Sequence, residues 1–394
     1  MSDRIAESIS ALAPKYVEFL RRLVQIPSPL GQEEDCQLLV AEYMRQLADS
    51  VAIVHSRNGS GVNLAVKIAG AGGGASLVLN AHCDIAPAEG DWEHPPHDAI
   101  VSDGLLYGRG AQDDKAGIAV ILLVAEALQK AGVRLHGDLI LHSVVEDETS
   151  GNGSKALVEA GFSGDGVVIC DGTWPERIIY GHLGQVWLDV SVIGSPVAAC
   201  VEHRGVNPIY LGHEFITKLR AWADEMNGQT DAFENIERPF FVNVGSFHSG
   251  VWYGSVPARA DLQIQVGFGP QLQPAKVISL ARDLALSVSD RINVRQGMLS
   301  TPAVRVPRDN ALIARLKEII EKNSGREILT QAVTGHCDMR HFRTENICLY
   351  GPGAGWNAHG INECYRLSDM GVVARNLAEF TMAWCGVVAN SDRR

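Results

Sequence analysis

The sequence predicts an α/β protein: a catalytic domain with a central, mostly parallel sheet flanked by helices, and a smaller α+β domain inserted into it. Short apolar segments of strand character alternate with segments of helical periodicity along the first part of the chain. Several of these segments end in a histidine or an acid within a glycine-rich loop. Between residues 182 and 297 apolar and polar residues alternate, as in a sheet with one exposed face. We therefore expect residues 1–181 and 298–394 to form the catalytic domain and 182–297 to form the insert.

The catalytic half opens with two expected helices. Residues 3–25 carry apolar residues at helical spacing, and Pro27 stops this helix because proline cannot continue it. A second helix is expected from about Glu33 to Leu47. Further on we expect strands at 51–56, 63–70, 76–84, 139–145 and 167–170, and a helix that ends near 130. In the insert we expect strands at 184–194, 241–250 and 260–268, and helices near 209–226 and 274–289.

Composition and charge narrow the class of protein. The chain has 394 residues, too many for one ordinary core, with 46% hydrophobic and 20% charged residues. A net charge of −12 argues against nucleic acid and anionic membranes as partners. No apolar run approaches the roughly 20 residues that span a bilayer. The N-terminus lacks a signal-peptide pattern, and the eight cysteines are scattered without a Cys-x-x-Cys pair, so we expect a cytoplasmic protein with reduced thiols.

The first candidate metal ligand closes the expected strand at 76–84. Alternate residues of a strand share a face, so His82 and Asp84 point the same way. An imidazole can bind a metal ion while a nearby carboxylate fixes the tautomer of the ring. A lone His-x-Asp triplet is more often structural than functional. It indicates a metal site only if later stretches of the chain supply further candidate ligands.

Two of those later stretches are acidic. Asp113 and Asp114 lie just before an apolar helix, where they could cap the helix or one of them could bind a metal ion. Glu146, Asp147 and Glu148 follow a buried strand. Three acids in that place repel one another unless a cation or a proton lies among them, although a solvated acidic turn is the alternative.

Two more ligands complete the pattern. Asp171 follows another apolar strand, and His359 lies far downstream in a glycine-rich loop. Ligands of open α/β sheets bind beyond the carboxyl ends of the strands, so we expect five of these side chains to meet. Imidazole and carboxylate groups suit zinc, manganese or cobalt, and five ligands exceed one tetrahedral ion. We therefore expect two divalent ions, with zinc preferred, bridged by one carboxylate among His82, Asp113, Glu148, Asp171 and His359.

These stretches resemble those of the dinuclear-zinc metallopeptidases and deacylases, the family of acetylornithine deacetylase, succinyl-diaminopimelate desuccinylase, aminoacylase and the glutamate carboxypeptidases. The resemblance covers nearly the whole chain and rests on AHCDIAP, LYGRGAQDDKAG, SVVEDETSGNG, CDGT and GPGAGWNAHGINE. It implies that Asp113 bridges two ions, with His82 and Asp171 on one ion and Glu148 and His359 on the other. It also implies an inserted lid domain that forms a homodimer.

The expected general base departs from the family pattern. Relatives carry a Glu immediately before the Glu ligand, and here that position is Asp147, which is one methylene shorter. A shorter reach to the attacking water can be costly, so Glu146 is the alternative base. Asp84 is implied to orient His82.

The insert also departs from the family pattern. The resemblance implies a lid histidine that stabilises the oxyanion, but the aligned residue is Ala198, and His203 or His336 could compensate. Where relatives have an arginine at the end of a lid strand this chain has Gln265, which weakens the case for binding a substrate carboxylate. The stretch TGHCDMRHF matches one that lies near substrate in relatives. The expected substrate-binding residues are Arg340, Asp338, His336, His203 and Asn243.

The leading hypothesis is a two-metal hydrolase that cleaves an amide-type C–N bond in a small N-acylated amine, amino acid or dipeptide. A water between the ions would lose a proton to Asp147 or Glu146 and attack the carbonyl, and the same acid would protonate the leaving amine. One alternative is a deaminase or a ring-amide opener of the same fold. Another is a non-catalytic protein that metal ions stabilise. In each case the expected partner is a small molecule, with no nucleic acid and no membrane.

Overall fold

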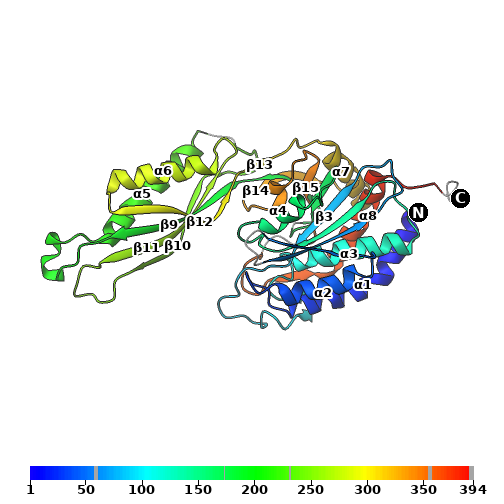
Figure 1. Ribbon diagram of the computed structural model, residues 1–394, viewed down its shortest axis with the longest axis horizontal. Helices are drawn as coiled ribbons and strands as arrows, with labels where there is room; N and C mark the ends of the chain where they lie inside the picture. Colours follow the sequence, from blue (N-terminus) through cyan, green and yellow to red (C-terminus); the bar gives the residue numbers. More distant parts are fainter. Residues whose placement is uncertain (57–60, 173, 230–231, 354–356, 390–394) are drawn as a thin grey trace. The chain divides into compact units, whose positions relative to one another are not determined.

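The computed structural model describes residues 1–56, 61–172, 174–229, 232–353 and 357–389 (Figure 1). The chain forms two compact units. Unit 1 comprises Met1–Tyr180, Val306–Gln331 and Cys337–Arg394, and unit 2 comprises Gly181–Arg305 and Ala332–His336. The expected boundary at 297 falls inside a strand, β12 (Ile292–Thr301), which belongs to unit 2 in full.

The main sheet of unit 1 confirms the expected fold class. Its strands follow the order β1, β2, β6, β3, β7, β15, β8. The central pairs β6–β3, β3–β7 and β7–β15 are parallel, and the outer pairs are antiparallel. These strands are β1 (Ala52–His55), β2 (Val62–Ile68), β3 (Leu77–His82), β6 (Leu139–Val144), β7 (Gly166–Ile169), β8 (Arg177–His182) and β15 (Ile347–Leu349). Strands β13 (Val304–Arg305) and β14 (Leu329–Val333) pair with β8, and β16 (Cys364–Arg366), β5 (Leu105–Tyr107) and β4 (Ile100–Ser102) form a small separate sheet.

Helices cover the central strands of this sheet. Every residue of β3 and β6 is buried, as expected for parallel strands with both faces covered. Helix α3 packs on β3 and against the three helices α1, α2 and α8, and its apolar residues are buried on all sides of the helix (Figure 1). The helical segments of unit 1 are α1 (Ser2–Val24), α2 (Glu34–Met44), α3 (Lys115–Lys130), α4 (Asn152–Glu159), α7 (Ala311–Ser324), η2 (Asp338–His341) and α8 (Leu367–Cys385).

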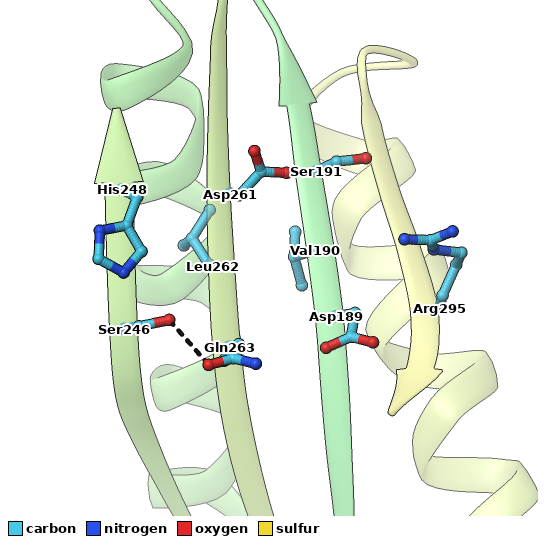
Figure 2. Close-up of a pocket in the computed structure, with 9 residues that line it drawn as sticks. All are labelled: Asp189, Val190, Ser191, Ser246, His248, Asp261, Leu262, Gln263 and Arg295. Carbon is cyan, nitrogen blue, oxygen red and sulfur yellow. Dashed lines mark hydrogen bonds between the residues drawn. The ribbon is translucent and has the colours of Figure 1, made fainter. Parts of the chain in front are cut away.

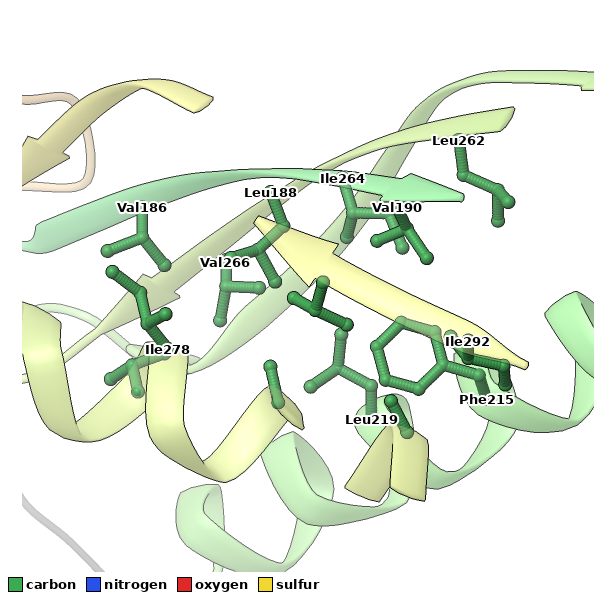
Figure 3. Close-up of a cluster of buried hydrophobic side chains, with 14 of the residues drawn as sticks. Val186, Leu188, Val190, Phe215, Leu219, Leu262, Ile264, Val266, Ile278 and Ile292 are labelled. Carbon is green, nitrogen blue, oxygen red and sulfur yellow. The ribbon is translucent and has the colours of Figure 1, made fainter. Parts of the chain in front are cut away.

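Unit 2 is an antiparallel sheet with helices on one face. The strand order is β10 (Phe241–Ser249), β11 (Arg259–Phe268), β9 (Gly184–Ile193) and β12. Helices α5 (Pro208–Asn227) and α6 (Pro274–Val288) pack on this sheet, and a short helix, η1 (Ala199–Arg204), precedes α5. Figure 3 shows the apolar core between sheet and helices, and Figure 2 shows polar side chains along the same strands. The expected alternation of a half-exposed sheet is therefore confirmed.

The parallel strands determine where the candidate ligands meet. His82 is the last residue of β3, Glu148 follows β6 and Asp171 follows β7. Because β3 pairs in parallel with both β6 and β7, their carboxyl ends lie at the same edge of the sheet. The sheet thus brings one candidate ligand from each strand to one place.

Two further expectations concern the whole chain. All eight cysteines are free, in agreement with the absence of a disulfide framework. Within the described ranges, the structure contains no helix with the length and apolar character that a bilayer crossing requires.

Candidate metal centre

The first group of candidate ligands consists of His82, Asp113 and Asp171. His82 Nε2 lies 3.2 Å from Asp113 Oδ1 and 3.9 Å from Asp171 Oδ1. One ligand atom from each residue lies within 4.8 Å of the others, and His82 itself is buried. Two carboxylates and an imidazole at this spacing can hold one divalent ion.

The second group consists of Asp113, Glu148 and His359. His359 Nε2 lies 3.2 Å from Asp113 Oδ2 and 2.9 Å from Glu148 Oε1. The two oxygens of Asp113 therefore face two different histidines, one at the end of β3 and the other in the loop before β16. A carboxylate shared in this way is the arrangement expected of a bridging ligand between two ions.

The protonation of these groups agrees with a site for cations. Hydrogen bonds to Asp113 and Glu148 raise the pKa of His359 to about 11. Burial, reinforced by the charge of Asp113, raises the pKa of Glu148 to about 7. Burial and Asp113 also raise the pKa of Asp171 well above its usual value. Burial and neighbouring like charges thus disfavour the ionised forms of Glu148 and Asp171, and a cation among them would offset both effects, so the donor set fits divalent metal ions.

Asp84 contacts both sides of the candidate centre. The carbonyl oxygen of Asp84 lies 3.1 Å from His82 Nδ1, and its carboxylate oxygen Oδ1 lies 3.4 Å from the same nitrogen. The carboxylate also accepts the backbone N–H groups of Asp147 and Glu148. Nδ1 of His82 thus faces Asp84 while Nε2 faces the carboxylate of Asp113, and the orienting role that the resemblance implies for Asp84 stays a prediction.

The two aspartates before α3 have different surroundings. Asp113 faces the histidines, whereas Asp114 is the N-cap residue of α3 and accepts the N–H of Gly117. The other oxygen of Asp114 lies 3.3 Å from the backbone nitrogen of His82. Asp114 thus caps the helix, and Asp113 is the aspartate that stays a candidate metal ligand.

The two candidate bases also differ. The Glu146 carboxylate accepts the hydroxyl of Ser150 at 2.5 Å and the amide of Asn152 at 3.1 Å, so it is engaged in the turn after β6. Burial is the largest influence on the pKa of both His82 and Asp171, and the charge of Asp147 is among the further causes that raise both pKa values. Because Glu146 is engaged in the turn, Asp147 is the better candidate base.

Asp338 and Arg340 lie beside Asp147 rather than on the surface. Asp338 is 1% exposed and accepts the Ser154 hydroxyl at 2.5 Å. Burial, and then the Asp147 carboxylate, raise its pKa well above its usual value. The Arg340 guanidinium is buried and donates to the Asp147 carbonyl and to Nε2 of His341. Asp338 is too deeply buried to contact a substrate in this conformation, and its place is behind the candidate base.

The remaining expected residues belong to unit 2. His203 is exposed in η1, and His336 Nδ1 lies 3.1 Å from Gln185 Oε1. Asn243 on β10 is directly opposite Gln265 on β11, so their side chains lie on one face of the sheet. Both line a pocket together with Trp187, Gly297 and Met298.

The sequence analysis did not name two buried residues that contact the candidate metal centre. Arg109 and Glu363 are both buried, and Glu363 accepts the backbone N–H of Asp113. The only local signal is that each charged residue lies in the same glycine-rich stretch as a ligand. Nothing in the sequence shows that the two residues pair.

The fold and the two ligand groups define a metallohydrolase. The chain belongs to the peptidase family M20/M25/M40, whose model matches residues 78–383. This confirms the resemblance described above, and the protein is a metal-dependent hydrolase that acts on carbon–nitrogen bonds.

Curated relatives align along most of the chain. The N-formyl-4-amino-5-aminomethyl-2-methylpyrimidine deformylase of Bacillus subtilis is 24% identical over 429 residues, covering 96% of this chain and 98% of the relative. A probable succinyl-diaminopimelate desuccinylase of Staphylococcus epidermidis is 24% identical over 367 residues, covering 85% of this chain and 90% of the relative. Among solved structures, the dipeptidase Dug1p of Saccharomyces cerevisiae superposes with a TM-score of 0.82 at 16% identity, covering 98% of each chain, which supports the fold.

Proposed function

We propose that this protein hydrolyses an amide-type C–N bond in a small N-acylated amine, amino acid or dipeptide, using two divalent ions. The ions, zinc in first place and manganese or cobalt as alternatives, would be held by His82, Asp113, Glu148, Asp171 and His359. The observation that carries the proposal is the position of the Asp113 carboxylate, whose two oxygens each lie 3.2 Å from a different histidine.

The residues around the centre supply the proton transfers. Divalent ions held there would polarise the substrate carbonyl and lower the pKa of a bound water. Asp147 takes the proton from the attacking water and delivers it to the leaving amine. The Asp84 carboxylate accepts the backbone N–H of Asp147 at 3.3 Å, and this hydrogen bond fixes the backbone from which the Asp147 side chain extends. Asp338 and Arg340 support Asp147 from behind, so we assign them a positioning role rather than direct substrate contact.

The pocket on the insert is lined by side chains of unit 2. Its polar side chains are the amides of Asn243, Gln263 and Gln265 and the carboxylate of Asp189, and Trp187 and Met298 supply apolar surface. These residues offer no guanidinium to grip a carboxylate. Together with the Asp189 carboxylate they disfavour an anionic group on a bound ligand. The relative of Bacillus subtilis is named for an N-formyl aminopyrimidine. Ala198 occupies the position of the lid histidine, and we propose that His203 or His336 replaces its function.

We further propose that the protein is cytoplasmic and forms a homodimer through the insert. All eight cysteines are free, which agrees with a reducing compartment. Sedimentation equilibrium at micromolar concentration tests the dimer, and a monomer at that concentration contradicts it.

A hydrolysis panel tests the proposed reaction. The purified chain is stripped with a chelator, reloaded with zinc, manganese or cobalt, and incubated with N-formyl, N-acetyl and N-succinyl amines, N-acyl amino acids and dipeptides. Release of a primary amine together with the carboxylic acid is the expected result. The matched control is Asp113→Asn, which keeps the size of the bridging residue and removes its charge.

Three outcomes contradict the proposal. Turnover no higher than that of Asp113→Asn with every metal excludes the reaction on this panel. Release of ammonia without a carboxylic acid indicates the deaminase alternative. Zinc-dependent thermal stability without turnover of any substrate indicates a metal-stabilised binding protein.

A further inference from the structure

The Glu363 carboxylate is enclosed by donors from one loop. It is fully buried, and Oε1 accepts the backbone N–H groups of Gln112 at 3.0 Å and Asp113 at 3.2 Å. Oε2 accepts the N–H of Gly110 at 3.1 Å and Nη1 of Arg109 at 2.6 Å. One side chain thus holds three backbone amides of the segment that ends in the candidate bridging ligand.

The Arg109 guanidinium extends this arrangement to a second ligand. Its Nη2 donates to the carbonyl oxygen of His359 at 2.9 Å and lies 3.3 Å from the carbonyl oxygen of Pro87. The ring of Trp92 lies 5.3 Å from the guanidinium carbon, at a distance suited to a cation–π contact. Because Arg109 is 1% exposed, its charge is compensated mainly by Glu363.

The loop that carries His359 needs such support. His359 and Asn362 adopt φ values of 60° and 59°, in the left-handed region that side chains disfavour. Asn and His enter this region more readily than most residues, and contacts with the surroundings stabilise them there. The His359 ring contacts the Asp113 carboxylate directly. The backbone of the loop is joined to the Asp113 segment by the hydrogen bond from Arg109 to the His359 carbonyl, by the Glu363 carboxylate, and by the Gly108 N–H that donates to the Glu363 carbonyl.

We propose that Arg109 and Glu363 are positioning residues of the metal centre, which together fix the bridging Asp113 relative to His359. The inference rests on the proposed two-metal function. Arg109 acts on the ion between Asp113, Glu148 and His359, because it contacts the backbone of His359. Glu363 acts on both ions, because it holds the backbone of the residue that they share.

Zinc titration of two variants tests this assignment. Arg109→Lys keeps the positive charge beside Glu363 and loses the second nitrogen that reaches His359. Glu363→Gln keeps the size of the side chain and replaces one acceptor with a donor. Zinc affinities are measured in competition with a chromophoric chelator. We expect Arg109→Lys to lower the affinity for one of the two zinc ions by 10–100-fold, and Glu363→Gln to lower the affinity for both.

A matched control separates positioning from general stability. Glu126→Gln breaks a partly buried ion pair of Glu126 with Lys15 in the same unit. It should lower the melting temperature of the metal-free protein without changing either zinc affinity. Zinc affinities of Arg109→Lys and Glu363→Gln within twofold of the wild type would overturn the positioning role. Fewer than two zinc ions on the wild type would instead overturn the two-metal centre.

A measurement on the wild type decides the matter even if the variants do not fold. Hydrogen exchange of the metal-free protein should show the amides of Gly110, Gln112 and Asp113 already protected, because Glu363 holds them without metal. Exchange as fast as in exposed loops, with protection only after zinc is added, would show that the metal and not Glu363 orders the segment.

Discussion

The carboxylate of Asp84 accepts the backbone N–H of Glu148, with 3.1 Å between Oδ2 and the nitrogen. The neighbouring Oδ1 accepts the N–H of Asp147, and the carbonyl of the same residue contacts the ring of His82. Asp84 therefore determines the geometry of one proposed ligand of each ion and of the proposed base. An arrangement of this kind links the loops after β3 and β6 more tightly than chain connectivity does.

We expect Asp84→Asn to weaken zinc binding and to lower kcat together. The amide nitrogen of Asn would face a backbone N–H that now donates to an oxygen, so the loop after β6 has to move. Loss of such an outer contact costs 10–100-fold in metal affinity or activity. Zinc titration and steady-state kinetics measure both effects, and Asp91→Asn, a change at an exposed residue, is the control.

Asp147→Asn should abolish most activity and retain both ions. Removing a general base costs on the order of 10²- to 10⁴-fold in kcat, and Asp147 is not a proposed ligand. Kinetics at saturating zinc, with the metal content measured by elemental analysis, checks this outcome.

Glu146→Gln should act on stability instead. The Glu146 carboxylate accepts two side-chain donors in the turn after β6, and losing one such bond to a charged group costs roughly 1–3 kcal/mol. We expect a lower free energy of unfolding with kcat within a few-fold of the wild type. The reverse pattern, a silent Asp147→Asn and an inactive Glu146→Gln, would identify Glu146 as the base.

Removal of metal should lower the melting temperature of the wild type. A ligand present at about 1,000 times its dissociation constant stabilises the folded state by about 4 kcal/mol. Calorimetry with and without chelator measures the difference. His359→Ala should retain part of it, because the group formed by His82, Asp113 and Asp171 stays intact, whereas Asp113→Asn should abolish nearly all of it. Equal responses of these two variants would contradict a bridging role for Asp113.

Acid should destabilise the metal-free protein through His142. This fully buried histidine of β6 lies beside Asn80 and Phe342, and burial lowers its pKa to about 3. The unfolded chain has a histidine pKa of about 6.5, so it binds the proton more readily and stability falls as the pH drops from about 6.5 toward 3. The loss from this group between pH 7 and pH 5 should be about 2 kcal/mol. Denaturant unfolding in chelator at both pH values, compared with His142→Gln, checks this, and equal pH slopes would contradict it.

Much of the fold could be predicted because its signals are local. The periodicity of α1 and the apolar runs of β3 and β6 are contained in single segments, and a parallel sheet aligns the ends of such strands. The five proposed ligands could be named for the same reason, since each follows a strand or precedes a helix. Strand β12 was not anticipated.

The support of the centre could not be predicted in the same way. Glu363 and Arg109 pair although they are 254 residues apart in the sequence, and neither residue alone differs in the sequence from an ordinary surface charge. The burial of Asp338 and the engagement of Glu146 with Ser150 also depend on tertiary packing. Such contacts depend on which loops come together in the folded chain, and the local sequence of one loop does not indicate which other loop it contacts.

The order of the ligands along the chain has a consequence for biosynthesis. His82, Asp113 and Asp171 all precede the insert, whereas His359 follows it. During translation, all three residues of the first candidate group are therefore synthesised before His359, which belongs to the second candidate group. The group of Asp113, Glu148 and His359 thus cannot be complete before the segment that follows the insert has been synthesised.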